Sequence, residues 1–113
     1  MQNNDKFKVI NETKKFILYT KEILVNYPRK YYVLKDRIEK TSYEILELIY
    51  LTNMVDDRLY NQKVILSKIS MLDFYLEISN NDEIISLKKL NQGTRLLDII
   101  KKLIYGWINS NGS

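Results

Sequence analysis

A chain of 113 residues with a net charge of +4 and 45% apolar residues has the size and composition of one globular domain. It contains no cysteine and no histidine, which excludes disulfides and thiolate metal sites and removes the commonest catalytic base. Three glycines and one proline leave few turn residues, which favours a few long helices over many strands. No apolar run approaches the roughly 20 residues of a membrane span, and the polar start lacks a signal-peptide core, so we expect a cytoplasmic protein without membrane contact.

The first helix is predicted over about residues 9–26. Its apolar side chains fall on one side at helical spacing, and the pattern stops at Pro28. The proline ring cannot continue a helix but suits the first turn of the next one. The residues expected in the core are Ile10, Phe16, Ile17, Thr20, Ile23, Leu24 and Tyr27.

A second helix is predicted after Pro28, and a third after the turn TNMVDD. Along the second, one stripe of residues recurs at intervals of three and four: Leu34, Ile38, Thr41, Ile45, Leu48 and Thr52. The third repeats this pattern with Leu59, Leu66, Ile69, Leu72 and Leu76, flanked by Ile65. We expect Asp56 or Asp57 to cap the start of the third helix and the stretch ISNNDE to end it.

The fourth helix is predicted to follow Ser86, which suits its N-cap. Its core-facing residues are Leu87, Leu90, Leu97, Ile100, Leu103, Ile104 and Trp107. Further apolar residues at Leu96, Ile99 and Ile108 extend this surface over more than half of the circumference. Two explanations remain open, a wide core-facing stripe or a surface for self-association.

The four segments together predict an all-α fold, an antiparallel up-down four-helix bundle with short connections. No repeat, linker or low-complexity tract divides the chain. We therefore expect a single domain over residues 1–113, with frayed ends at about 1–7 and 110–113.

Motifs for catalysis are missing from the sequence. It contains no nucleophile elbow, phosphate-binding glycine loop or calcium loop, so we expect neither an enzyme nor a cofactor. Glu44 and Glu47 lie three residues apart, but carboxylate metal sites in bundles also need a histidine three residues after a glutamate. A solvated helix face is the favoured interpretation of this pair, and no metal site is predicted.

Positive charge is concentrated in two stretches, with a net charge of +3 over residues 29–40 and +4 over residues 86–113. Four polar residues of the fourth helix share one face at spacings of four, three and seven: Lys88, Gln92, Arg95 and Lys102. Clustered cations suit the phosphates of a nucleic acid, although solvated helix faces carry lysine as well. The candidate nucleic-acid-binding residues are Arg29, Lys30, Lys35, Arg37, Lys88, Lys89, Arg95, Lys101 and Lys102.

Two tyrosines and two glycines each leave alternatives open. Tyr31 and Tyr32 either stack on unpaired bases or pack across the helix joint, and packing is favoured. Gly93 lies mid-helix at a cost of about 1 kcal/mol relative to alanine, which a close helix approach, a local break or a contact between protomers would explain. Gly106 marks either such a contact or a fraying end. The candidate oligomer-interface residues are Gly93, Ile99, Ile104, Gly106 and Trp107.

Four stretches occur in the order and spacing of one family of small bacterial bundles: PRKYYVLKDRIEK, IEKTSYEILELIYLTN, LSKISMLDFYLEIS and LLDIIKKLIYGWINS. Over residues 14–109 the chain resembles the accessory variability proteins of diversity-generating retroelements and their relatives encoded in intervening sequences of bacterial 23S rRNA genes. Pro28, Arg29 and Lys30 look like the PRK at the first joint of the accessory proteins. The rRNA-associated relatives tend to show phenylalanine, proline and lysine followed by an acidic residue, so the retroelement branch is favoured.

The resemblance implies a homopentameric barrel of four-helix protomers with a basic surface. It also implies association with the element's reverse transcriptase and template RNA, with DNA as an alternative nucleic acid, in an assembly that supports mutagenic cDNA synthesis. Two departures matter: Glu77 stands where the family often has arginine, and Tyr105 with Gly106 replaces the usual glycine pair before the closing tryptophan. The first departure leaves the basic role to the first joint and the fourth helix.

The expectation is therefore a non-enzymatic, homo-oligomeric adaptor that binds RNA through a basic surface and docks a reverse transcriptase. The alternative is an intervening-sequence-type four-helix bundle that acts as a structural or protein-interaction scaffold without specific RNA binding.

Overall fold

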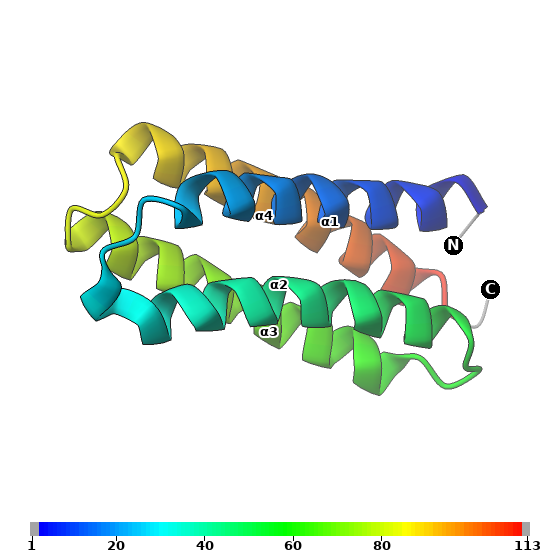
Figure 1. Cartoon of the computed structure of the whole chain (residues 1–113). Helices are drawn as coiled ribbons and strands as arrows, with labels where there is room; N and C mark the ends of the chain where they lie inside the picture. Colours follow the sequence, from blue (N-terminus) through cyan, green and yellow to red (C-terminus); the bar gives the residue numbers. More distant parts are fainter. Residues whose placement is uncertain (1–2, 112–113) are drawn as a thin grey trace.

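A computed structural model describes residues 3–111, with side chains from residue 7 onward, and shows four long α-helices (Figure 1). They are α1 (Asn3–Leu24), α2 (Tyr32–Asn53), α3 (Leu59–Asn81) and α4 (Leu87–Asn109), with a short 3-10 helix η1 (Arg29–Tyr31) before α2. No strand occurs within the described residues. The predicted all-α fold with four helices is confirmed. α1 begins earlier than predicted, and the expected fraying at residues 1–2 and 112–113 lies outside the described residues.

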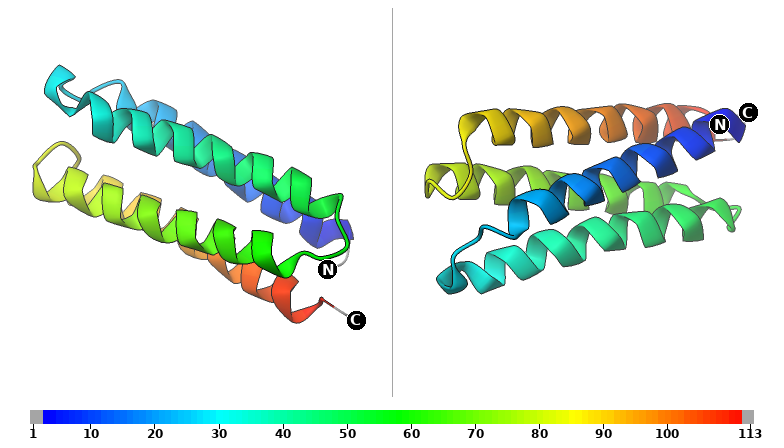
Figure 2. Two further views of the ribbon diagram at one scale, coloured as in Figure 1. Left: turned by 90° about the horizontal axis from the view of Figure 1, so that it is seen from below. Right: turned by 45° about the horizontal axis from the view of Figure 1, so that its top comes forward.

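Each helix packs against two neighbours, α1 and α3 each contacting both α2 and α4. Within the described chain, the backbones of α1 and α3, and those of α2 and α4, do not approach each other closely, so these pairs lie diagonally across the core. The connections at residues 25–31 and 82–86 lie together at one end of the elongated molecule (Figures 1 and 2). We call this the joint end. The α2–α3 connection, the start of α1 and the end of α4 lie at the other end.

The core is built from the helical stripes that the sequence predicts. Ile38 and Ile45 of the predicted α2 stripe are fully buried, and the same holds for Trp107 of α4 and Phe16 of α1. Ile49, which lies beside that stripe, is fully buried as well. Complete burial of such side chains stabilises the fold by about 1.5–3 kcal/mol each. Ile65, predicted on the flank of α3, also belongs to the core.

Two predicted core residues are instead exposed. Leu59 is 41% exposed and Leu87 is 62% exposed. Each is the first residue of its helix. The core itself continues past Leu87, because Ile85 is buried and belongs to it. The helical period identified the correct face, but it does not show which side chains at a helix start are covered.

The helix boundaries confirm three of the predicted end signals and contradict one. Pro28 separates α1 from α2, α3 ends within ISNNDE, and Ser86 caps α4 by accepting a hydrogen bond from the Lys89 backbone N–H at 3.1 Å. The predicted aspartate cap of α3 is wrong. Its N-cap is Arg58, whose side chain makes no capping bond and donates from Nε to the Val55 carbonyl at 3.0 Å.

Candidate nucleic-acid interface

Seven of the nine cations predicted to bind nucleic acid are exposed, and Lys89 and Lys101 are half-buried. Five of the exposed ones lie at the joint end, in η1 and the first turns of α2 and α4: Arg29, Lys30, Lys35, Arg37 and Lys88. Arg95 lies further along α4, and Lys102 lies toward its far end. Within residues 7–111, none of these seven side chains forms an ion pair. They are therefore available to an external anion.

The two predicted basic clusters lie on α2 and α4, which are diagonal in the bundle and whose backbones do not approach each other closely within the described chain. Helix α1 packs against both and so lies between them. It exposes four lysines that the sequence analysis did not include, Lys8, Lys14, Lys15 and Lys21, of which Lys15 pairs with Glu12. Lys14 and Lys21 lie seven residues apart and therefore share one face of α1. Whether this face lies beside the other cations depends on how α1 packs, which the spacing does not show.

Charge differs between the two sides of the molecule. From residue 7 onward, α1 carries four lysines and two glutamates, and both glutamates form ion pairs with lysines. Helix α3 carries Lys63 and Lys68 against Asp73 and Glu77. The loops at its ends add one arginine, Arg58, and four further carboxylates: Asp56, Asp57, Asp82 and Glu83. The surface formed by the joint, α1 and α4 is therefore basic, whereas the α3 side is acidic. We call the first the basic surface.

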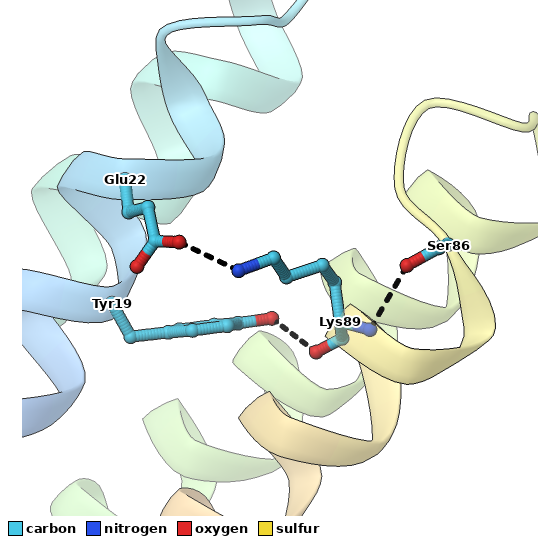
Figure 3. Close-up of polar contacts among 4 residues, drawn as sticks. All are labelled: Tyr19, Glu22, Ser86 and Lys89. Atoms are coloured by element: carbon cyan, nitrogen blue, oxygen red, sulfur yellow. Dashed lines mark hydrogen bonds and ion pairs between the residues drawn. The ribbon is translucent and has the colours of Figure 1, made fainter.

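Lys89 ties α4 to α1 through its ammonium group and its carbonyl, and its backbone N–H bonds the cap of α4 (Figure 3). Its Nζ lies 2.6 Å from Glu22 Oε1, its carbonyl accepts a hydrogen bond from the Tyr19 hydroxyl at 2.7 Å, and its N–H bonds the Ser86 cap. Burial raises the pKa of the Tyr19 phenol, with smaller contributions from Tyr27 and Glu22, so the hydroxyl remains a donor. Lys89 thus holds two helices together, and its charge is already matched by Glu22.

Lys101 also faces carboxylates within the chain. Its Nζ lies 3.6 Å from Asp73 of α3 and 4.0 Å from Asp98 of α4. Burial raises the pKa of the Asp73 carboxyl, and Lys101 opposes that shift. The ammonium group offsets the cost of the half-buried carboxylate, so Lys101 is less available to a phosphate than its neighbour Lys102.

At the first joint, the two tyrosines have different surroundings. The Tyr31 ring is half-buried and packs against the core, as the favoured interpretation predicted, and Lys30 Nζ lies 5.3 Å from its ring centroid. Tyr32 is 70% exposed, so packing across the joint is wrong for this residue. It lies beside Lys35, Asp36 and Glu39 around a shallow hollow. Its ring is free to contact a ligand.

Three of the five predicted oligomer-interface residues are enclosed by the chain itself. Ile104 and Trp107 are fully buried, and Gly93 faces Tyr19 and Leu76. A side chain that its own protomer covers cannot meet another protomer, so these three residues are removed from the predicted interface. Ile99 is half-buried, and Gly106 is exposed with no heavy atom near the position of an added Cβ.

Within the described residues no cluster of three or more carboxylates could hold a metal ion. Glu44 lies 3.5 Å from the Lys68 ammonium, on a solvated helix face. No helix in the described part of the chain is long and apolar enough to cross a membrane.

Comparisons with known proteins add no assignment to this geometry. No protein-family model matches the chain, and none of the curated proteins compared with it is similar enough to count as a match.

Proposed function

We propose that this chain is a non-enzymatic RNA-binding adaptor, the accessory protein of a diversity-generating retroelement. In this proposal it is an antiparallel bundle and one protomer of a homopentameric barrel, which binds the reverse transcriptase and the template RNA in the cytoplasm and supports mutagenic cDNA synthesis. The observation that carries it is the basic surface, on which the exposed cations of the joint, α1 and α4 other than Lys15 have no carboxylate partner in the described chain. The four stretches that resemble the accessory proteins support the choice of family.

RNA binding would be electrostatic on this surface. Lysines and arginines that neutralise phosphates release condensed counterions, and the logarithm of the affinity then falls by about 0.7 per neutralised phosphate for each tenfold rise in salt. Such contacts hold the RNA backbone without reading its sequence. An oligomer would present several equivalent basic surfaces and would raise the effective concentration of RNA beside a docked polymerase.

Exposed apolar side chains supply surface for protein partners. Phe74 and Met71 of α3 are 53% and 42% exposed, and Leu51 and Met54 at the end of α2 are exposed as well. Met71 and Phe74 lie three residues apart and share one face of α3, and adjoining apolar side chains of this kind are found at sites that contact another protein. It supports contacts with another copy of the chain or with the polymerase, on a side of the bundle different from the basic surface.

The proposal is tested by RNA binding of a matched pair of double variants. Replacing Arg95 and Lys102 by glutamine removes two unpaired cations of the basic surface, and we expect the affinity for single-stranded RNA at low salt to fall about tenfold or more. The control replaces Lys63 and Lys68 of α3 by glutamine, which removes the same charge from the acidic side. Equal losses in both variants, or no RNA binding by the wild type at low salt, would contradict the proposal.

Self-association is tested separately by light scattering. The purified chain should have a mass several times the 13.5 kDa of one protomer. A monomer at all concentrations would remove the pentamer from the proposal. Replacing Gly106 by glutamate adds a charge to an exposed position and should lower the mass if this position lies in the interface.

A second candidate function is favoured by the acidic, partly apolar α3 side. A structural scaffold of the intervening-sequence type would use that side to bind a protein and would not need the basic surface. The gene's surroundings distinguish the two candidates. A neighbouring reverse-transcriptase gene with template and variable repeats favours the accessory protein, and a position inside an rRNA gene favours the scaffold.

A further inference from the structure

A groove of about 380 Å³ lies between the joint and α3 at the joint end, within the size range of sites that hold small ligands. It brings together residues from η1, the first turns of α2 and the end of α3. They are Lys30, Tyr31, Val33, Leu34, Arg37, Tyr75 and Ile78. The groove thus combines two cations, two aromatic rings and three aliphatic side chains, and no carboxylate is among these lining residues.

A second groove on the other side of the α3 end has the opposite charge. It lies between α3 and α4, and its lining includes the carboxylates of Glu77 and Asp82 but no cation. Two grooves therefore flank one helix end, and only the one beside the joint is lined by cations. The Asp82 carboxyl of the second groove also accepts a hydrogen bond from the Tyr31 hydroxyl, so the anion site of the first groove is confined to its Lys30 and Arg37 side. A phosphate would be repelled from the second groove and drawn to Lys30 and Arg37 in the first.

The walls of the first groove are held in place by buried hydrogen bonds. The Tyr27 hydroxyl donates to Ser79 Oγ at 2.7 Å, and Ser79 Oγ donates to the Tyr75 carbonyl at 2.8 Å. This chain of bonds ties the joint to the α3 wall. The Tyr31 backbone N–H donates to the Pro28 carbonyl at 2.9 Å, which fixes the turn that carries Lys30 and Tyr31.

Both aromatic rings of the groove pack against the core with one part and remain partly open. Rings that are already ordered lose little conformational entropy when a ligand binds. Flat aromatic faces beside cations are the usual means by which proteins hold an unpaired base and its phosphate together. Aliphatic side chains complete an apolar floor for the base.

We propose that this groove binds one unpaired nucleotide of a single-stranded RNA, with the base against Tyr31 or Tyr75 and the phosphate at Lys30 and Arg37. The inference rests on the proposed function and adds to it. The basic surface would bind the backbone of both single-stranded and double-stranded RNA, whereas the groove would bind only an unpaired base. It would favour single-stranded over double-stranded segments of a bound RNA.

The test uses Val33, which is 58% exposed on the groove wall, and Leu51, which is 50% exposed on the same helix. Leu51 lies beside Glu44 and Glu47 in a different groove near the other end of α2. Val33→Asp and Leu51→Asp add the same charge, but only Val33→Asp adds it where the nucleotide would bind. An aspartate near a helix N-terminus is compatible with folding. The probe is a labelled RNA of about 12 nucleotides, alone and annealed to its complement.

We expect Val33→Asp to weaken binding of the single strand about tenfold or more, because stacking and phosphate contacts are both lost. Binding of the duplex should change no more than in Leu51→Asp. Equal effects of the two variants on the single strand would overturn the groove proposal and leave the proposed function intact. A wild type that binds neither RNA at low salt would overturn both.

Arg37→Gln provides a second variant that leaves the apolar wall unchanged. Arg37 is exposed and has no ion pair within residues 7–111. The variant Arg37→Gln should weaken binding of the single-stranded RNA more than Lys63→Gln, which removes an exposed cation from α3. Equal losses would count against the groove in the same way.

Discussion

Gly93 offers the sharpest test of how α4 packs against its neighbours. An alanine Cβ at this position would lie 2.6 Å from the Tyr19 hydroxyl oxygen and 2.7 Å from Leu76 Cδ1. Both distances are shorter than real Cβ contacts, so a neighbour must move. The Leu76 methyl is the end of a flexible side chain, but the Tyr19 hydroxyl is held by its hydrogen bond to the Lys89 carbonyl. Gly93→Ala therefore either breaks this bond or displaces the helix.

The expected change in the free energy of unfolding combines one stabilising and two destabilising contributions. Alanine in a helix interior is favoured over glycine by about 1 kcal/mol. Overpacking of a close-packed core costs about 1–3 kcal/mol, and loss of the hydrogen bond from Tyr19 costs about 1 kcal/mol more. We expect Gly93→Ala to lower the free energy of unfolding by about 1–3 kcal/mol, and Tm by about 5–15 °C.

Gly106 provides the matched control on the same helix. An added Cβ there meets no heavy atom within 4 Å, so Gly106→Ala should raise the free energy of unfolding by up to about 1 kcal/mol. Both variants are measured by urea denaturation followed by circular dichroism, and Tyr19→Phe is added in each background. Tyr19→Phe should cost less stability in the Gly93→Ala protein than in the wild type, because the hydrogen bond is already weakened there. A Gly93→Ala protein as stable as the wild type would refute the close approach.

Three further changes test single contacts by the same denaturation assay. Ser86→Ala removes the side-chain cap of α4 and should cost about 1 kcal/mol, whereas an unchanged stability would mean that the cap contributes nothing. Tyr27→Phe removes the buried hydrogen bond to Ser79 and should also cost about 1 kcal/mol. An unchanged stability would mean that this bond does not hold the joint to α3. Burial raises the pKa of Asp73 in the folded state, so its charged form opposes folding above that pKa and this penalty disappears as the pH falls through it. Asp73→Asn should therefore gain stability relative to the wild type as the pH rises through the raised pKa, and a difference that shrinks with rising pH would contradict the shift.

Local sequence signals were sufficient to predict the number of helices and most of their ends. Residues that face the core recur every three or four positions, and Pro28 and Ser86 mark helix ends by their own backbone chemistry. The aspartate cap of α3 was predicted wrongly because Arg58 bonds the preceding loop, and a propensity for capping does not reveal this competition. Leu59 and Leu87 were predicted wrongly because a periodic pattern does not show which side chains in the first turn of a helix are covered by neighbouring elements.

The site depends on contacts between residues far apart in the chain. Tyr19 and Lys89 lie 70 positions apart, and the ion pair between Lys89 and Glu22 spans 67. No spacing rule connects them, so Lys89 was predicted to bind nucleic acid. For Gly93, the close helix approach is confirmed and the contact between protomers is not. Likewise, only the packing of α1 between α2 and α4 shows that the exposed Lys14 belongs with the other cations.

The most direct test of the basic surface is the salt dependence of single-stranded RNA binding. The slope of log affinity against log salt should be steep for the wild type, and it should become shallower by about 1.4 when Arg95 and Lys102 are replaced by glutamine, since each neutralised phosphate contributes about 0.7. The control that replaces Lys63 and Lys68 should keep the wild-type slope. An affinity that does not change with salt, or a slope that is the same in all three proteins, would contradict the account.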